Sequence, residues 1–251
     1  MGVASLLSDL LDFCYPGACM ACEAGTENGR PLCPNCDGEL AKLEARPACG
    51  FCGKPVGGDD DEGTCPYCGG EGIAHYDRVV RLGTFTDPLK HLIHRIKFHH
   101  RWSVGEVLAD RLAENRRAAA MLREAEVIVP VPLHRLRHVA RGFNQAEIIA
   151  RRLRKRNGHL RLARPAVRVR DTAAQTGLTS AAQREENMRD AFGLVDPRSV
   201  RGRHVVVVDD VTTTGATLRS FARVLGPAKP ASLCALVLAV ADPKGRDFQS
   251  I

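Results

Sequence analysis

The sequence contains no apolar run long enough to cross a membrane. Its longest uncharged apolar stretch, near residues 232–241, has about ten residues, whereas a spanning helix needs roughly 20. The N-terminal stretch MGVASLLSDLLDFC carries acidic residues where a secretory signal carries basic ones. We therefore expect a cytoplasmic protein without membrane insertion. The same stretch predicts a short amphipathic helix, with Leu6, Leu7, Leu10 and Leu11 on one face.

Aromatic residues are also scarce, at 5% of the chain. Bases of single-stranded nucleic acids stack on aromatic side chains, so this scarcity argues against a dedicated single-strand platform. Trp102 and Phe143 are the candidates for such stacking. The sequence has neither GxxxxGK[ST] nor GxGxxG, which disfavours a P-loop or a dinucleotide-binding fold.

Charge is unevenly distributed along the chain, whose net charge is +7. Residues 1–77 carry 4 basic and 13 acidic side chains, a formal charge of −9. Residues 78–170 carry 22 basic and 7 acidic side chains (+15), and residues 171–251 carry 10 and 9 (+1). This distribution predicts two domains, residues 1–77 and residues 78–251, of which the second handles polyanions.

Eight of the ten cysteines form four CxxC pairs within residues 1–77. The pairs are Cys19/Cys22, Cys33/Cys36, Cys49/Cys52 and Cys65/Cys68. A CxxC turn presents two thiolates on one side of a tight loop, and two such turns complete a tetrahedral four-cysteine zinc site. We therefore predict a small cysteine-rich domain with two structural zinc ions. The spacing leaves open whether neighbouring or interleaved pairs form each site.

Other interpretations of the cysteines are weaker. Disulfides are the alternative to metal, but they form in exported proteins, and no export signal is expected here. A single CxxC pair could be a redox centre, whereas four nearly regular pairs favour metal. A nucleic-acid-binding zinc module is disfavoured, because residues 1–77 are already acidic and each four-thiolate zinc site adds about two negative charges.

From residue 78 onward, strand and helix patterns alternate. Residues 81–86, 127–131, 205–208 and 233–240 read as strands, the last three of them buried. Apolar residues at helical spacing predict helices near residues 89–96, 104–108 and 147–156 and after residue 217, with a loop between residues 131 and 147. The alternation predicts an α/β fold with a doubly wound, mostly parallel sheet.

The stretch VVVVDDVTTTGAT, residues 205–217, has the composition of a ligand site. Neighbouring carboxylates repel each other unless a cation or a polyhydroxyl ligand compensates. The threonine-rich turn precedes a predicted helix, so its N–H groups and hydroxyls can bind a phosphate. Ligands of doubly wound sheets bind at the carboxyl ends of the strands. A phosphate beside a diol describes a ribose 5-phosphate; a Walker-B-like strand or a capped turn is the alternative.

This stretch resembles the 5-phosphoribosyl 1-diphosphate (PRPP) motif of type I phosphoribosyltransferases. Three further features resemble one branch, the ComF or amidophosphoribosyltransferase-like family: VPVPLHRLRHVARGFNQAEIIA, RVRDTAAQTGLTSAAQREENMRDAF and the N-terminal CxxC region. The resemblance covers nearly the whole chain, in the same order. It implies a type I phosphoribosyltransferase-like sheet that binds PRPP with magnesium.

The resemblance also implies roles for single residues. Asp209 and Asp210 are expected to contact the ribose hydroxyls, and Arg137 and Arg141 the pyrophosphate. The expected 5-phosphate loop comprises Thr212, Thr213, Thr214, Gly215, Ala216 and Thr217. Arg170 begins an expected mobile loop, whose polar positions are Thr172, Gln175, Arg184 and Asn187. Asp209, Asp210 and Arg170 are the expected catalytic residues, and Lys97 and Phe98 resemble a family position of unassigned role.

The resemblance implies two classes of function. The first is a phosphoribosyltransferase that transfers the phosphoribosyl group to an unidentified acceptor and releases pyrophosphate. The second is a non-catalytic PRPP sensor or a single-stranded-DNA-handling protein of natural competence and DNA uptake, with a competence helicase or processing protein as partner. The basic middle segment has more cationic side chains than the roughly three to five that PRPP needs, so DNA stays an alternative ligand.

Overall fold

The computed structural model describes residues 17–27, 29–57, 65–98, 101–171, 186, 188 and 190–241. The predicted N-terminal helix around Leu6 to Leu11 lies outside these residues. So do Thr172, Gln175, Arg184 and Asn187 of the expected mobile loop. No helix in the described part of the chain is both long enough and apolar enough to cross a membrane.

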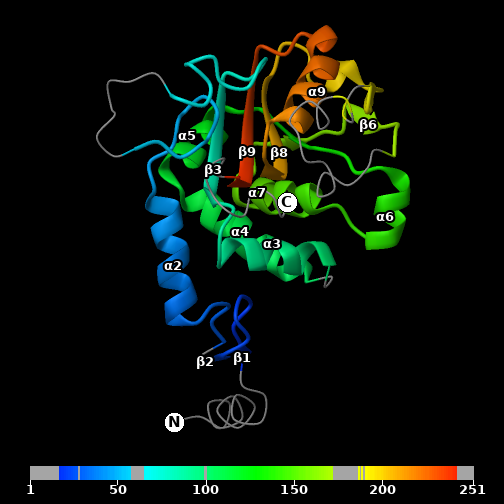
Figure 1. Ribbon diagram of the computed structural model, residues 1–251. Coiled ribbons are helices and arrows are strands. Elements are labelled where there is room, and N and C mark those ends of the chain that lie inside the picture. The colour runs from blue at the N-terminus through cyan, green and yellow to red at the C-terminus, as the bar shows by residue number, and fades with distance from the viewer. Residues whose placement is uncertain are drawn as a thin grey trace.

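A five-stranded sheet with strand order β3-β9-β8-β4-β5 forms the centre of the molecule, and every pairing in it is parallel. Figure 1 shows its strands β3, β9 and β8 side by side. Its strands are β3 (Arg78–Thr84), β4 (Val127–Pro130), β5 (Arg161–Leu162), β8 (His204–Thr212) and β9 (Ser232–Val240). Helices cover both faces, so the predicted α/β fold with a doubly wound parallel sheet is confirmed.

Strand β8 shows how the sequence divides the core between the two faces. Successive side chains of a strand point to opposite faces. Val206 and Val208 lie in the core on one face, here called the first face, and Val205 and Val207 lie in the core on the second face. All four are buried, which explains why the run is continuously apolar rather than alternating.

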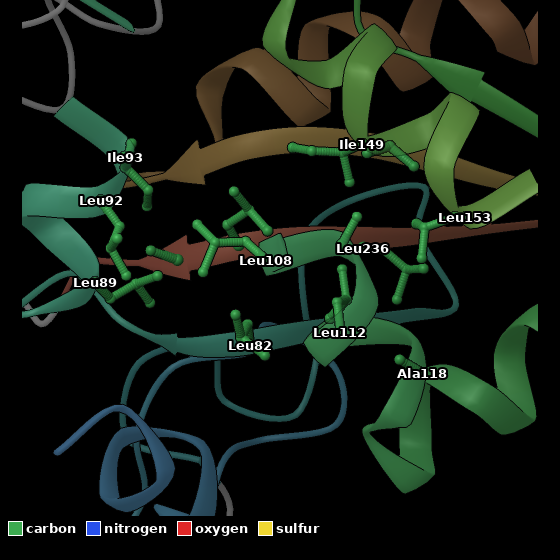
Figure 2. Close-up of a cluster of buried hydrophobic side chains, with 14 of the residues drawn as sticks. Leu82, Leu89, Leu92, Ile93, Leu108, Leu112, Ala118, Ile149, Leu153 and Leu236 are labelled. Atoms are coloured by element: carbon green, nitrogen blue, oxygen red, sulfur yellow. The ribbon is translucent and has the colours of Figure 1, made fainter. Parts of the chain in front are cut away.

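Four helices and their leucines cover the first face. They are α3 (Leu89–Phe98), α4 (Trp102–Glu114), α5 (Arg116–Glu124) and α7 (Gln145–Arg156). Figure 2 shows Leu108 and Leu112 of α4 between the sheet residues Leu82 and Leu236 and the α7 residues Ile149 and Leu153. Helix α2 (Pro34–Ala45) adds its buried leucines at the edge strand β3.

The second face is covered by helix α9 (Ala216–Leu225), by a small antiparallel sheet and by part of the cysteine-rich region. The small sheet consists of β6 (Ala166–Arg168) and β7 (Phe192–Leu194). A second two-stranded sheet, β1 (Gly17–Ala18) and β2 (Gly25–Thr26), lies in the cysteine-rich region. Two 3-10 turns, Pro197–Ser199 and Gly226–Ala228, complete the described elements.

The structure corrects the predicted loop between β4 and α7. Residues there form a seven-residue helix, α6 (Arg135–Arg141). His134 caps it by accepting the N–H of Leu136, and Gly142 ends it in the left-handed conformation, with φ of 76°. Helix α6 has no buried residue, so it lacks the apolar periodicity from which α3, α4, α7 and α9 were predicted. Helices α2 and α5 were also not predicted. Strand β8 also runs past Val208 as far as Thr212.

Candidate functional site

The eight CxxC cysteines form two separate clusters, each from neighbouring pairs. Cys19, Cys22, Cys33 and Cys36 form the first cysteine cluster, and Cys49, Cys52, Cys65 and Cys68 form the second. Within each cluster, one sulfur atom per residue lies within 4.8 Å of the other three. The structure therefore decides between the neighbouring and interleaved arrangements that spacing had left open.

The geometry of both clusters fits zinc. Sγ–Sγ distances of 3.7 Å (Cys22–Cys33) and 3.8 Å (Cys49–Cys68) equal the edge of a tetrahedron whose zinc–sulfur bonds are about 2.3 Å long. These distances are too long for disulfide bonds. Backbone N–H groups of Ala21 and Phe51 point at Cys19 Sγ and Cys49 Sγ, each at 3.4 Å. Such donors stabilise thiolates, the form that binds metal.

A polar cavity of about 380 Å³, here called the candidate pocket, lies at the carboxyl ends of β4 and β8. Elements along the chain from α3 to the start of α9 contribute to it. Its polar lining residues are Lys97, Arg137, Arg141, Asn144, Gln145, Arg168, Asp209, Asp210, Thr213 and Thr217. Four cations therefore face two carboxylates, which suits a ligand that carries both anionic groups and hydroxyls.

Asp209 and Asp210 point to opposite faces of the sheet, because β8 continues through both of them. On the first face, Asp210 Oδ2 lies 3.1 Å from Lys97 Nζ of α3. Among the described residues, no cation forms an ion pair with Asp209 comparable to that of Lys97 with Asp210. Burial, and secondarily the charge of Asp210, raise the pKa of Asp209 to about 7. The two carboxylates therefore differ: Asp210 forms an ion pair within the protein, whereas ionised Asp209 needs a further positive charge or hydrogen-bond donor.

Arg168 is a pocket cation that the sequence interpretation passed over in favour of Arg170. It packs against the ring of Phe192 at 5.6 Å, and burial, followed by the nearby charge of Arg137, lowers its pKa to about 10. Arg170 is exposed and does not line the pocket. The alternation Val167-Arg168-Val169-Arg170 was the available signal, because it places both arginines on one side of an extended segment.

Gln145 and Asn144 were also missed. Asn144 caps α7, since its Oδ1 accepts the N–H of Ala146, and its Nδ2 donates to Val131 O at 2.9 Å. Gln145, at the first position of α7, is 2% exposed, and its Nε2 has no hydrogen-bond partner among the described residues. A buried amide that lines a pocket and lacks a partner indicates a ligand acceptor atom.

The threonine-rich turn joins β8 to α9, as predicted, and residues 212–217 are here called the phosphate loop. Gly215 has φ of 80°, a conformation that favours glycine, and directly precedes the ten-residue helix α9. Thr214 Oγ1 accepts the N–H of Ala216 at 3.4 Å, and Thr214 O accepts from Arg219 at 2.8 Å. Of the six predicted phosphate-loop residues, Thr213 and Thr217 line the candidate pocket.

Part of the charge asymmetry is neutralised within the chain. Arg95 pairs with Glu23 at 2.9 Å, and Arg111 pairs with both Glu44 and Asp37. These ion pairs join the basic middle segment to the acidic cysteine-rich region. On α7, Arg152 pairs with Asp110 at 2.6 Å. The excess of +15 therefore overstates the charge available to a polyanion.

Comparison with known proteins agrees with this architecture. Residues 105–250 match the family described as "Phosphoribosyl transferase domain", and residues 10–71 match "Double zinc ribbon domain". The chain is 35% identical over 214 residues to "DNA utilization protein YhgH" of Escherichia coli, covering 83% of this chain and 84% of that protein. It is 32% identical over 196 residues to "Competence protein F" of Haemophilus influenzae, covering 76% and 83%. To "Competence protein ComFC" of Bacillus subtilis the identity is 24% over 213 residues, covering 82% and 83%.

A parallel α/β domain with a cationic pocket beyond its strand ends, preceded by two four-cysteine zinc ribbons, defines a phosphoribosyltransferase-fold protein. The chain belongs to the phosphoribosyl transferase domain family, in the ComF branch that includes competence protein F. The predicted family is thereby confirmed, whereas the boundary between residues 77 and 78 stays a prediction.

Proposed function

We propose that the candidate pocket binds PRPP with magnesium and that the protein transfers its phosphoribosyl group to an acceptor, with release of pyrophosphate. The observation that carries this proposal is the convergence of four cations and two neighbouring carboxylates in one cavity beside the phosphate loop. PRPP has the matching chemistry, because it joins a phosphate and a diphosphate through a ribose with vicinal hydroxyls.

Each end of the ligand has a matching part of the pocket. The 5-phosphate binds at the phosphate loop, where the start of α9 supplies N–H donors and the positive end of a helix dipole. Arg137 and Arg141 of α6, with Arg168 of β6, bind the diphosphate. Asp209 and Asp210 accept hydrogen bonds from the ribose hydroxyls. Hydrogen bonds from hydroxyl groups stabilise the ionised form of a carboxylate, so the ribose would offset the cost of ionising the buried Asp209.

Magnesium fits the same donor set. It is held in such sites by one or two carboxylates together with ligand phosphates and water, and Asp209 and Asp210 provide the carboxylates. When bound with PRPP, the ion would neutralise charge on the leaving diphosphate. In the transfer, the bond from C1 of the ribose to the diphosphate oxygen breaks and the leaving group keeps the electron pair. The acceptor then forms the new bond to C1 and loses a proton.

The protein's own contribution is electrostatic. Positive charge develops on the ribose ring as the diphosphate leaves, and fixed carboxylates beside the ring stabilise it. Arginines aimed at the diphosphate stabilise the leaving group. Arg170 borders a segment outside the described residues, and its catalytic role through loop closure stays a prediction.

Calorimetric titration with magnesium–PRPP tests the proposal. We expect saturable binding to the zinc-loaded protein and about 30-fold weaker binding to Asp209→Asn and to Asp210→Asn, because each loses a charged acceptor worth about 2 kcal/mol. Asp196→Asn changes an exposed carboxylate that follows β7 and does not line the candidate pocket, so this matched control should bind normally. Absence of binding to the unaltered protein would refute the proposal. Pyrophosphate release with candidate acceptors then tests transfer.

A second candidate function is handling of single-stranded DNA. Two of the chain's few aromatics, Phe98 and Trp102, are 60% and 58% exposed, and the guanidinium of Arg141 lies 5.8 Å from the Phe98 ring. Exposed rings beside arginines can stack bases, and the names of the relatives refer to competence and DNA use. An oligonucleotide titration at several salt concentrations tests it, because phosphate contacts produce a steep salt dependence. Trp102→Ala should weaken such binding without affecting magnesium–PRPP, because Trp102 does not line the candidate pocket, whereas Phe98 does.

A further inference from the structure

The second cysteine cluster is joined to the central sheet by residues 69–77, here called the linking segment. Backbone hydrogen bonds hold this region against the sheet: Val79 N donates to Gly50 O at 3.1 Å, and Asp77 N donates to Leu233 O at 2.8 Å. Beside Cys52, Gly53 packs so closely on the sheet that an added Cβ would lie 3.2 Å from Val240 Cγ2. The second cluster is therefore part of the core on the second face.

Ile73 of the linking segment packs against Gly215 of the phosphate loop. It is 5% exposed. A Cβ added to Gly215 would lie 3.2 Å from Ile73 Cδ1 and 3.4 Å from Cγ1. Gly215 is the residue whose left-handed conformation turns the chain into α9. The side chain of Ile73 therefore limits how far Gly215 can move toward the linking segment.

Tyr76 of the same segment belongs to the core of the second face. Burial, with the charge of Asp209 as a further cause, raises the pKa of Tyr76. Its side chain is 6% exposed, and its hydroxyl has no hydrogen-bond partner in the part of the chain that the structure describes. A buried hydroxyl without a partner costs free energy.

The first cysteine cluster has different neighbours. Three of its cysteines, Cys19, Cys33 and Cys36, belong to the core of the first face together with α2, α3 and α4. The region is tied to α3 by the Glu23–Arg95 ion pair and to α4 by Asp37–Arg111. Leu32, 4% exposed in this core, is the counterpart of Ile73.

We propose that the second cysteine cluster and the linking segment form one wall of the phosphoribosyl site, with Ile73 positioning the phosphate loop. Metal in the second cluster then stabilises the loop, and a ligand on the loop tightens the metal in return, because coupling between two sites is reciprocal. Metal in the first cluster is not coupled in this way. The ligand half of this statement rests on the proposed function.

Hydrogen exchange of the full-length, zinc-loaded, ligand-free protein tests the wall directly. Ile73→Ala should raise amide exchange in residues 212–217 at least about tenfold, since the loop loses its packing partner. Ile73→Val should restore exchange to within about twofold, and Leu32→Ala should leave it unchanged. Equal exchange of this loop in Ile73→Ala and Leu32→Ala would overturn the proposal.

Zinc release to a colorimetric chelator tests the coupling. Two release phases are expected, and Cys22→Ser and Cys68→Ser each remove one and thereby assign them. Magnesium–PRPP should slow the second-cluster phase at least about fivefold and leave the first unchanged. Ile73→Ala should reduce this slowing, whereas Leu32→Ala should not. Ligand binding with both phases unchanged would overturn the proposal. Failure of magnesium–PRPP to bind at all would instead refute the proposed function. Hydrogen exchange of residues 212–217 would then still test whether the linking segment positions the loop.

Discussion

Lys97 Nζ and Asp210 Oδ2 lie 3.1 Å apart at the carboxyl end of the sheet, and their side chains are only 21% and 16% exposed. The pair joins the end of α3 to the end of β8, which are separated by more than a hundred residues in the chain. It explains why two adjacent carboxylates can coexist there. The strand turns them to opposite faces, and a lysine from another element compensates one of them.

This pair should show strong energetic coupling. Lys97→Met leaves a half-buried carboxylate without its cation and should lower the free energy of unfolding by about 2 kcal/mol. Lys97→Met combined with Asp210→Asn should recover most of that loss. Urea denaturation of the four proteins measures the coupling in a double-mutant cycle. The exposed pair Lys42–Glu39 is the control, with expected coupling of about 0.3–0.5 kcal/mol. Similar coupling in both pairs would contradict the prediction.

Asp209 should make the ligand-free protein less stable as the pH rises. Its pKa in the folded protein, about 7, exceeds the ordinary value of 3.8. Between these values the folded state holds a proton that the unfolded state has lost, so stability falls as pH increases through this window. Asp209→Asn removes the effect. Relative to the unaltered protein, the variant should gain roughly 1–2 kcal/mol between pH 5.5 and pH 8 in urea denaturation. The free energy of unfolding of Asp196→Asn should depend on pH as that of the unaltered protein does. The same pH dependence in Asp209→Asn would disprove the assignment of the effect to Asp209.

Arg168 should contribute more to anion binding than Arg170. Arg168→Met removes a cation that lines the pocket, and we expect about 30-fold weaker binding of magnesium pyrophosphate by calorimetry. Arg170→Met should change binding by less than about threefold. Because Arg168 also packs on Phe192, Arg168→Lys controls for folding and should retain an intermediate affinity. Equal losses of affinity in Arg168→Met and Arg170→Met would show that Arg170 contributes to anion binding as much as Arg168 does.

Each cysteine cluster should bind one metal ion independently. Elemental analysis should find two zinc ions in the unaltered protein and one in either Cys22→Ser or Cys68→Ser. Cys234→Ser is the control, because Cys234 belongs to neither cluster. Cobalt substitution should produce the absorption of tetrahedral thiolate coordination in both clusters. Loss of both ions on a single substitution would show that the clusters are not independent.

The sequence by itself determined the sheet and most of its helices. Val127 and its neighbours, the valine run of β8 and the apolar run of β9 are continuously hydrophobic because they are buried on both faces. The CxxC spacing indicated two metal sites, and the aspartate–threonine turn predicted where a ligand would bind. These signals are local: they depend on residues within one strand, one turn or one helix face.

Only the tertiary structure decided which distant residues meet. Helix α6 escaped prediction because no apolar face marks it, and the pairing of CxxC units depends on chain path rather than spacing. Lys97, Gln145 and Arg168 reach the pocket from three separate elements. Their sequence neighbourhoods resemble ordinary solvated helix or strand positions. Packing of α3, α7 and β6 on one sheet brings them together, because cores are close-packed and leave few alternative arrangements.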